Sequence, residues 1–439
     1  MDRRPGQSAI LDHASSWPAR VTGENRHALR FVMFTILIDA MGFGLIMPVL
    51  PRLLMRVGSL SLDQAIGVST WMGLLMALAA FFSAPILGNL SDAFGRRRVL
   101  LIALAGMAAH YAVLAFAGSV AMVAFGRVLT GVFGGSYGPA QAAVADITAP
   151  EDRARNFGMV SAAFGVGFIA GPALGGMLTQ FGDTAPFWVA LALATANCIY
   201  GLTMFPETLK PEHRRPFSLA RANPFGAWRA AKASPGMRRI AFALLFWQVA
   251  SLVYPLTWSF WGIAQLGWSD RMIGLSLAAV GIVIALSQTF ITGPAVRRLG
   301  ERSAAQLGMV GAGLGFLGYA FCTSTVLAFV LLAAVALQSL VQPSLMALLS
   351  RRATAETQGE VQGLAAMVMG LGSIIAPLML VEPMAYFTSS RAPVYFPGAP
   401  FLIAAMVVAL AWLVLKTTPK RAGEATVEEA RREPAIDAS

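Results

Sequence analysis

Long apolar stretches alternate with short charged ones along almost the whole chain. A helix that crosses the hydrocarbon core of a bilayer needs roughly 20 residues with few charges. The gaps between charged residues therefore predict the spans, and two gaps that are too long for one helix divide at 118–119 and 323–325. The predicted spans lie within 30–52, 63–92, 98–118, 120–144, 155–183, 183–207, 239–270, 271–297, 302–322, 326–351, 360–382 and 391–416.

The twelve predicted spans form two sets of six, separated by a stretch rich in Arg, Lys and Pro. The loops after the second and eighth spans share a pattern, because Gly88 and Gly95 lie seven residues apart, as do Gly293 and Gly300, with basic residues close behind. Internal repeats are typical of transporters with two related halves. We predict an all-α membrane protein with twelve transmembrane helices in two six-helix halves. Its predicted parts are a cytoplasmic tail (1–28), an N-terminal bundle (29–206), a basic cytoplasmic linker (207–237), a C-terminal bundle (238–416) and a disordered cytoplasmic tail (417–439).

The composition favours a bilayer as the solvent of this chain. Hydrophobic residues make up 56% of it and charged residues only 13%, whereas a soluble globular chain carries roughly 25% charged residues. Residues 1–30 are polar and basic, without the apolar run and cleavage site of a signal peptide. The longest polar interior stretch, 207–239, is too short to fold alone, and the chain shows no catalytic constellation. These features argue against a membrane enzyme or sensor.

The distribution of basic residues predicts the orientation. When the loops are counted alternately from the N-terminal tail, one set holds nearly all the Lys and Arg, and the other holds only Arg52, Arg56, Arg271 and Arg391. The positive-inside rule makes the basic side cytoplasmic. We therefore expect a multi-pass protein of a bacterial inner membrane with both termini in the cytoplasm. The net charge of +11 then reflects topology and not a nucleic-acid partner.

One acidic residue, Asp39, lies near the middle of the first predicted span. An ionised carboxylate at that depth is costly unless it is paired or hydrated, and a low dielectric favours its protonated form. Asp39 is therefore the leading candidate for proton coupling or for binding a cationic substrate. The alternative is a structural role, as the partner of a helix N-terminus or of an amide.

Two further polar residues lie inside spans of the same half. Arg127, in the fourth span, keeps its charge, so it must face water, a carboxylate or carbonyl groups, unless it extends to the nearby interface. His110, in the middle of the third span, is either a second proton site or a neutral packing residue with a hydrogen bond. Both interpretations stay open for each residue.

Amide and aromatic side chains in the spans are candidates for a substrate cavity. A buried amide either meets a polar ligand or bonds across helices, and an aromatic ring either stacks on a planar drug or belongs to an interfacial belt. The candidates are Gln141, Asn197, Gln248, Trp258, Gln288, Gln338 and Gln342. Cys198 and Cys322 lie in apolar stretches, and we expect free thiols without a metal role.

Four segments of the chain resemble the major facilitator superfamily, and within it the drug–proton antiporters of the tetracycline efflux branch. Residues 39–51 resemble the first-helix signature, residues 88–98 the loop motif, residues 127–131 the fourth-helix motif and residues 165–176 the antiporter motif. The resemblance extends from about Phe31 to Lys416.

The resemblance implies proton-coupled efflux of a drug-like, tetracycline-type compound by alternating access. The proton gradient is the energy source, with no cofactor and no metal. The implied partners are a small-molecule substrate, protons and the lipid bilayer, and we expect a monomer. Our candidates for proton coupling are Asp39, Arg127 and His110. A gating loop that latches the two halves through charge pairs comprises Gly88, Asp92, Gly95, Arg96 and Arg97. The antiporter motif comprises Gly165, Gly171, Pro172, Gly175 and Gly176.

Three positions depart from the exporters that the chain resembles. Those exporters carry an aspartate where this chain has His110, a second aspartate where it has Ala312, and a histidine where it has Ile284. The loss of intramembrane acids changes which cation a cavity can neutralise. The alternative substrate is therefore another class of drug, or an endogenous metabolite, exported on the same scaffold.

Overall fold

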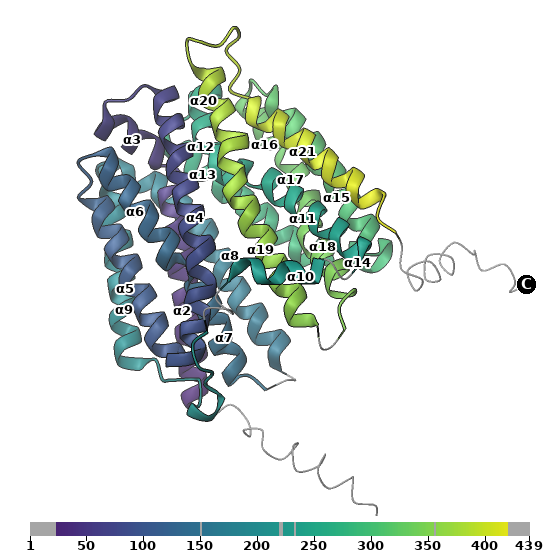
Figure 1. Ribbon diagram of the computed structural model, residues 1–439. Helices are drawn as coiled ribbons and strands as arrows, with labels where there is room; N and C mark the ends of the chain where they lie inside the picture. The colour runs from purple at the N-terminus through teal and green to yellow at the C-terminus, as the bar shows by residue number, and fades with distance from the viewer. Residues whose placement is uncertain (1–22, 150–151, 219–222, 232–233, 355–356, 420–439) are drawn as a thin grey trace, which may run out of the picture. The chain divides into compact units, whose positions relative to one another are not determined.

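The computed structural model describes residues 23–149, 152–218, 223–231, 234–354 and 357–419. Most of the two predicted tails, 1–28 and 417–439, lies outside these residues. The described chain is helical and contains no strand, which confirms the predicted all-α class (Figure 1).

Eleven helical stretches of the described chain are long and apolar enough to cross a membrane: His27–Ile46, Leu62–Phe94, Arg96–Ala115, Val120–Ile147, Arg155–Phe181, Ala185–Met204, Pro235–Leu266, Asp270–Leu299, Thr325–Ser350, Gln358–Thr388 and Ala399–Lys416. The ninth predicted span is helix α15 (Glu301–Ala320), in which five glycines dilute the apolar character. It packs against α21 (Ala399–Lys416) and α17 (Leu332–Gln338). With α15, the described chain has the twelve spans that the charge gaps predict.

Several spans are single helices, and others divide. The undivided helices are α2 (Gly23–Ile46), α4 (Leu62–Phe94), α5 (Arg96–Ala115), α8 (Arg153–Leu178), α9 (Ala185–Met204), α15 and α21. The divided spans are α6 (Val120–Phe133), η1 (Gly134–Ser136) and α7 (Tyr137–Ile147); α11 (Pro235–Ser251) and α12 (Val253–Leu266); α13 (Asp270–Ser287), η6 (Gln288–Thr292) and α14 (Gly293–Leu299); α16 (Thr325–Val330), α17 and α18 (Val341–Ser350); and α19 (Gln358–Ala376), η7 (Pro377–Val381) and α20 (Glu382–Thr388). Both η6 and η7 are π-helical turns, which occur frequently at functional sites.

Contacts group the described chain into two compact units. The first comprises residues up to 59, 78–223 and 270–278, and the second comprises 60–77, 224–269 and 279 onward. Helices α4 and α13 therefore each begin in one unit and continue in the other.

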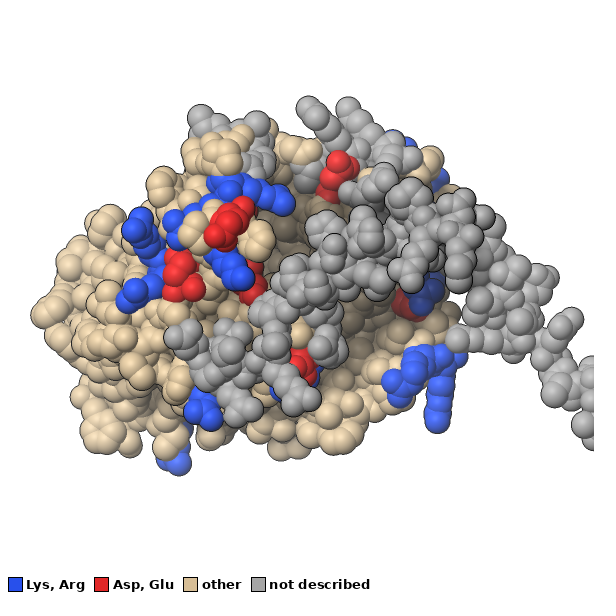
Figure 2. Space-filling model, turned by 90° about the horizontal axis from the view of Figure 1, so that it is seen from below, with Lys and Arg blue, Asp and Glu red and all other residues tan. Residues whose placement is uncertain are grey.

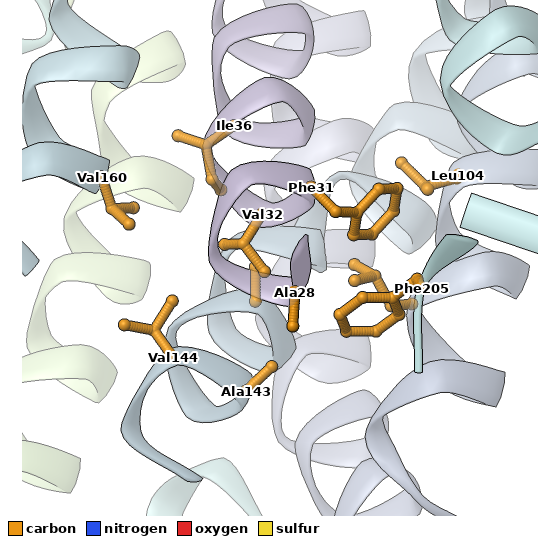
Figure 3. Packing of buried hydrophobic residues seen from close by; sticks show 11 residues of the cluster. Ala28, Phe31, Val32, Ile36, Leu104, Ala143, Val144, Val160 and Phe205 are labelled. Carbon is orange, nitrogen blue, oxygen red and sulfur yellow. The ribbon is translucent and has the colours of Figure 1, made fainter. Parts of the chain in front are cut away.

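The first unit has an apolar core around α2, shown in Figure 3. The ring of Phe31 in α2 packs at a tilt of 30° against that of Phe205, which follows α9, with 4.5 Å between the ring centroids. Val144 of α7 and Val160 of α8 are fully buried in the same cluster. This core fixes α2 at the centre of the unit, where α5, α7, α8 and α9 surround it.

Small residues allow α8 to approach α2 closely. A Cβ atom on Gly171 would lie 2.4 Å from the Met41 carbonyl oxygen, and similar clashes would occur at Gly167 with Leu37 and at Gly175 with Leu45. These glycines repeat every four residues and form one face of α8, as the sequence spacing predicts. Gly165 does not belong to this face, because a Cβ atom there would meet nothing within 4 Å.

The second unit has an aromatic core. Trp258 of α12 is only 1% exposed, and its ring lies 5.1 Å from that of Tyr319 and 5.2 Å from that of Trp261. Trp268 and Phe401 also contact the Trp258 ring. Protein side chains therefore cover Trp258, and it packs as core rather than facing a cavity in this conformation.

Replacement of Gly171 by Ala should destabilise the first unit, because the added Cβ would overlap the α2 backbone. Overpacking of this kind costs about 1–3 kcal/mol. Thermal melting of the purified protein in detergent measures the effect, and Gly165→Ala on the same helix is the matched control with melting close to wild type. Equal melting temperatures for the two variants would contradict this packing.

Candidate functional site

A cluster of buried polar side chains lies between α2, α5 and α6 in the first unit. It brings together Asp39 of α2, His110 and Tyr111 of α5, and Arg127 of α6. His110 is fully buried, Tyr111 is 2% exposed and Arg127 is 8% exposed, whereas Asp39 is half-buried. Of the three residues predicted for proton coupling, His110 and Arg127 interact electrostatically with each other, and Tyr111, an additional member, interacts with both Asp39 and Arg127.

The hairpin of α5 and α6 places Arg127 opposite His110. Ser119 caps α6 by accepting a hydrogen bond from the Met122 N–H, which fixes where the helix begins. His110 Nδ1 lies 2.7 Å from the Gly126 carbonyl oxygen. Because a carbonyl can only accept, Nδ1 carries the proton and donates it in this bond.

Tyr111 extends from α5 to α2. A Cβ atom on Gly42 would lie 2.0 Å from the Tyr111 hydroxyl oxygen, so the hydroxyl occupies the space that the missing side chain leaves. Gly42 lies three residues after Asp39 and therefore on the same face of α2. Tyr111 lies within electrostatic range of both Asp39 and Arg127, and Arg127 interacts electrostatically with His110 as well.

Three buried polar atoms of the cluster lack a hydrogen-bond partner in the described part of the chain, namely His110 Nε2, the Tyr111 hydroxyl and Arg127 Nε. An unpaired buried polar group costs about 1–3 kcal/mol. The cluster therefore combines a carboxyl group that can bind a proton, the positive charge of Arg127, and two groups, His110 and Tyr111, with spare hydrogen-bonding capacity. The described residues contain no group of three His, Cys, Asp or Glu side chains placed to hold a metal.

The amide candidates fall in different surroundings. Asn197 of α9 accepts a hydrogen bond from Thr35 of α2 at 3.2 Å, which matches the cross-helix interpretation. Gln141 and Gln338 are half-buried, and the side-chain oxygen of each is buried without a hydrogen-bond partner in the described chain. Gln248 packs against Gly372 of α19. Gln288 is exposed at the first position of the π-helical turn η6.

The predicted gating loop, between α4 and α5, is built around Arg96. Its guanidinium group pairs with Asp92 at 2.5 Å and with Asp146 of α7 at 3.0 Å, and it donates to the Ser91 hydroxyl. The Arg96 side chain is only 10% exposed, so these are partly desolvated ion pairs. Figure 2 shows basic and acidic side chains side by side on this face of the molecule.

The segment after α9 holds the same loop from the other side. Glu207 accepts the backbone N–H of Arg96 at 2.8 Å, and the Arg215 N–H donates to the Asp92 carbonyl at 3.1 Å. Arg97 donates to the Leu202 carbonyl at 2.7 Å.

The two predicted loop glycines differ in their surroundings. Gly95 has φ +102°, which favours glycine, and a Cβ there would lie 2.1 Å from Glu207. A Cβ on Gly88 would meet nothing within 4 Å. Gly95 is therefore required by the turn in this structure, whereas Gly88 is not.

The predicted antiporter motif has a second face on α8. A Cβ on Gly176 would lie 2.4 Å from the Asp270 carbonyl oxygen, and a Cβ on Gly274 would lie 2.3 Å from the Pro172 carbonyl oxygen. The first turns of α13 thus pack on α8 within the first unit. Asp270 also pairs with Arg52 of α3 (Leu50–Gly58) at 2.9 Å. The motif therefore positions two helices, α2 through one face and α13 through the other.

Sequence reasoning missed Tyr111, Asp146 and Glu207. Tyr111 directly follows His110, and that adjacency to a buried polar residue is the available signal. Asp146 and Glu207 are single acids at the ends of spans close to the basic loop, and complementary charge is the signal for them. Their pairing with Arg96 depends on tertiary structure.

Comparisons with known proteins agree with this architecture. The chain matches the family model described as Major Facilitator Superfamily over residues 32–377 and 263–437. It is 39% identical over 360 residues to the class C tetracycline resistance protein of Escherichia coli, covering 81% of this chain and 89% of that protein. It is 38% identical over 341 residues to the class G tetracycline resistance protein of Vibrio anguillarum, covering 78% of this chain and 86% of that protein.

Solved structures share the fold at low sequence identity. A D-xylose–proton symporter aligns with a TM-score of 0.74 and 17% identity, covering 90% of this chain and 98% of that chain. A human organic anion transporter aligns with a TM-score of 0.67 and 23% identity, covering 91% of this chain and all of that chain. The twelve-span fold and the match over most of its length establish that this chain belongs to the Major Facilitator Superfamily.

Proposed function

We propose that this protein exports a drug-like compound of the tetracycline type across the inner membrane in exchange for protons, by alternating access. The observation that carries the proposal is the half-buried carboxyl group of Asp39 inside the polar cluster of the first unit. Identity of 39% to a tetracycline resistance protein over 81% of the chain supports the substrate class.

Asp39 provides the chemistry that proton exchange needs. A carboxyl group in a low-dielectric site binds a proton more readily than in water, and it releases the proton when the site opens to water or when a cation approaches. Arg127 keeps its charge throughout and favours the ionised state of a nearby carboxylate. Proton binding and substrate binding are therefore mutually exclusive at this site, which is the condition for antiport.

The loop around Arg96 controls the conformational change. Its ion pairs join α4, α5 and α7 and the segment after α9, all within the first unit. These contacts brace the end of the unit so that it moves as one body. In the proposed cycle the same loop latches the two halves in one of the two conformations.

The remaining features of the proposal are those of a membrane carrier. The protein works as a monomer without a cofactor, and its partners are the small-molecule substrate, protons and the lipid bilayer. Both termini face the cytoplasm, as the distribution of basic residues predicts. Membership of a transporter superfamily also argues against an enzymatic activity.

A second substrate class is favoured by one specific observation. His110, Ala312 and Ile284 occupy positions where the tetracycline exporters that this chain resembles carry ionisable residues. Ala312 is buried and His110 is fully buried. A cavity with fewer acids suits a compound that does not travel as a metal complex, such as another drug class or an endogenous metabolite.

Replacement of Asp39 by Asn should abolish exchange, because an amide cannot bind and release the proton. We expect drug resistance of an efflux-deficient bacterium to fall to the level of cells without the transporter. The same change at Asp63, a half-buried acid in the first turn of α4, is the control with normal resistance. Undiminished resistance with Asn at position 39 and normal expression would refute the proposed coupling.

Replacement of Asp146 by Asn should weaken the brace, because it leaves a partly buried Arg96 with one fewer anionic partner. We expect a loss of stability of about 1.5–3 kcal/mol, as for a hydrogen bond between charged groups, and reduced transport, measured by detergent melting and vesicle uptake. Asp152→Asn is the control, since its pair with Arg155 is exposed and 3.7 Å long. If both variants transport and melt like wild type, the loop has no bracing role.

A susceptibility panel with and without a protonophore identifies the substrate class. We expect resistance to at least one of tetracycline, a phenicol and a cationic dye. Cells with the protein should accumulate less of that drug than cells without it, and the protonophore should abolish this difference. Strong and selective tetracycline resistance would remove the second substrate class. Resistance to the phenicol or the dye, without resistance to tetracycline, would support the second substrate class.

A further inference from the structure

The Tyr111 hydroxyl occupies a place that only a glycine on the facing helix leaves open. It comes so close to α2 that a Cβ on Gly42 would lie 2.0 Å from the oxygen. The Tyr111 side chain is almost completely buried. A phenylalanine ring would fill the same apolar space without the cost of burying a hydroxyl, so packing alone does not account for the tyrosine.

The hydroxyl has no hydrogen-bond partner in the described part of the chain. Buried polar groups in native proteins are nearly always paired, and an exception calls for an explanation. The hydroxyl lies beside the face of α2 that carries Asp39 and within electrostatic range of Asp39 and Arg127. A hydroxyl can both donate and accept a hydrogen bond, whereas an ionised carboxylate can only accept.

The elements packed around Asp39 supply few other ionisable groups. On α5 and α6 these are His110, Tyr111 and Arg127, since the other ionisable residues of α5, Arg96, Arg97 and Arg98, lie in its first turn. Helix α8 has no ionisable residue between Arg155 and its end. Helix α9 contributes Cys198 and Tyr200, which pack at the Phe31 cluster, and α7 contributes Asp146, which is paired with Arg96.

We propose that Tyr111 is a positioning residue for proton coupling, which rests on the function proposed above. Its hydroxyl donates a hydrogen bond to the Asp39 carboxylate when that group is ionised, and accepts one from the Asp39 carboxyl group when it is protonated. The hydroxyl keeps its own proton throughout. Tyr111 thereby holds Asp39 in one orientation in both protonation states and favours the ionised one, because it is a weak acceptor and a good donor.

Removal of the hydroxyl has a consequence that a purely structural role would not produce. Without a donor to its ionised form, Asp39 stays protonated to higher pH. Loss of one hydrogen bond to a charged group corresponds to a shift of about one pH unit in the midpoint of its titration. A structural role would lower the melting temperature without moving that midpoint.

Infrared spectroscopy of the purified full-length protein tests the proposal without a substrate. The carbonyl band that is absent from Asp39→Asn and present in wild type belongs to the Asp39 carboxyl group, and its intensity is followed against pH. We expect the midpoint in Tyr111→Phe to lie about one unit above that of wild type. Tyr200→Phe on α9 is the matched control, with an unchanged midpoint.

Gly42→Ala provides a second variant, because its Cβ displaces the hydroxyl and should raise the midpoint in the same direction. An unchanged midpoint in a stably folded Tyr111→Phe protein overturns the proposal, as does the absence of any band that depends on Asp39. The readout is separate from transport. If Asp39→Asn retains full proton exchange while Tyr111→Phe shifts the midpoint, the proposed function fails and the positioning of Asp39 by Tyr111 stands.

Discussion

The hydrocarbon core of a bilayer holds too little water to solvate an ionised side chain, and the first unit is organised around that constraint. A cluster of polar side chains from three helices forms there, although its members are far apart in the sequence: Asp39, His110, Tyr111 and Arg127. Tyr111 lies within electrostatic range of both Asp39 and Arg127, whereas His110 Nε2, the Tyr111 hydroxyl and Arg127 Nε lack a hydrogen-bond partner in the described part of the chain. Buried groups with unused hydrogen-bonding capacity beside a carboxyl group are what a site that binds and releases a proton requires.

Close helix packing sets the geometry of that cluster. The glycine face of α8 holds α2, and therefore Asp39, against the neighbouring helices. On the opposite side of the same segment, the first turns of α13 pack against Pro172 and Gly176. One short run of small residues thus connects the helix that carries the acid with a helix that begins in the first unit and continues in the second.

Much of the fold follows from the sequence, because the distance between charges in a membrane chain directly reflects the thickness of the bilayer. The twelve spans were predictable for that reason, and the glycine face of α8 was predictable because its glycines recur every four residues. The membership of Tyr111 in the cluster was not, because it depends on a space at Gly42 that only the packing of α5 on α2 reveals. Trp258 was a candidate for a substrate cavity, but its ring packs against Trp261 and Trp268 nearby in the sequence and against the distant Tyr319 and Phe401. A hydrophobic stretch predicts that its side chains are buried, but it does not predict which residues bury them.

The central claim is that drug movement and proton movement are obligatorily opposed. Proteoliposomes that contain the purified protein and a trapped pH-sensitive dye test it directly, with an inward gradient of tetracycline, or of whichever drug confers resistance, and no initial pH difference. The account predicts that the interior becomes alkaline as the drug enters, and that liposomes with Asp39→Asn show only the passive signal of empty liposomes. Protein-dependent drug entry with no change in internal pH would contradict it.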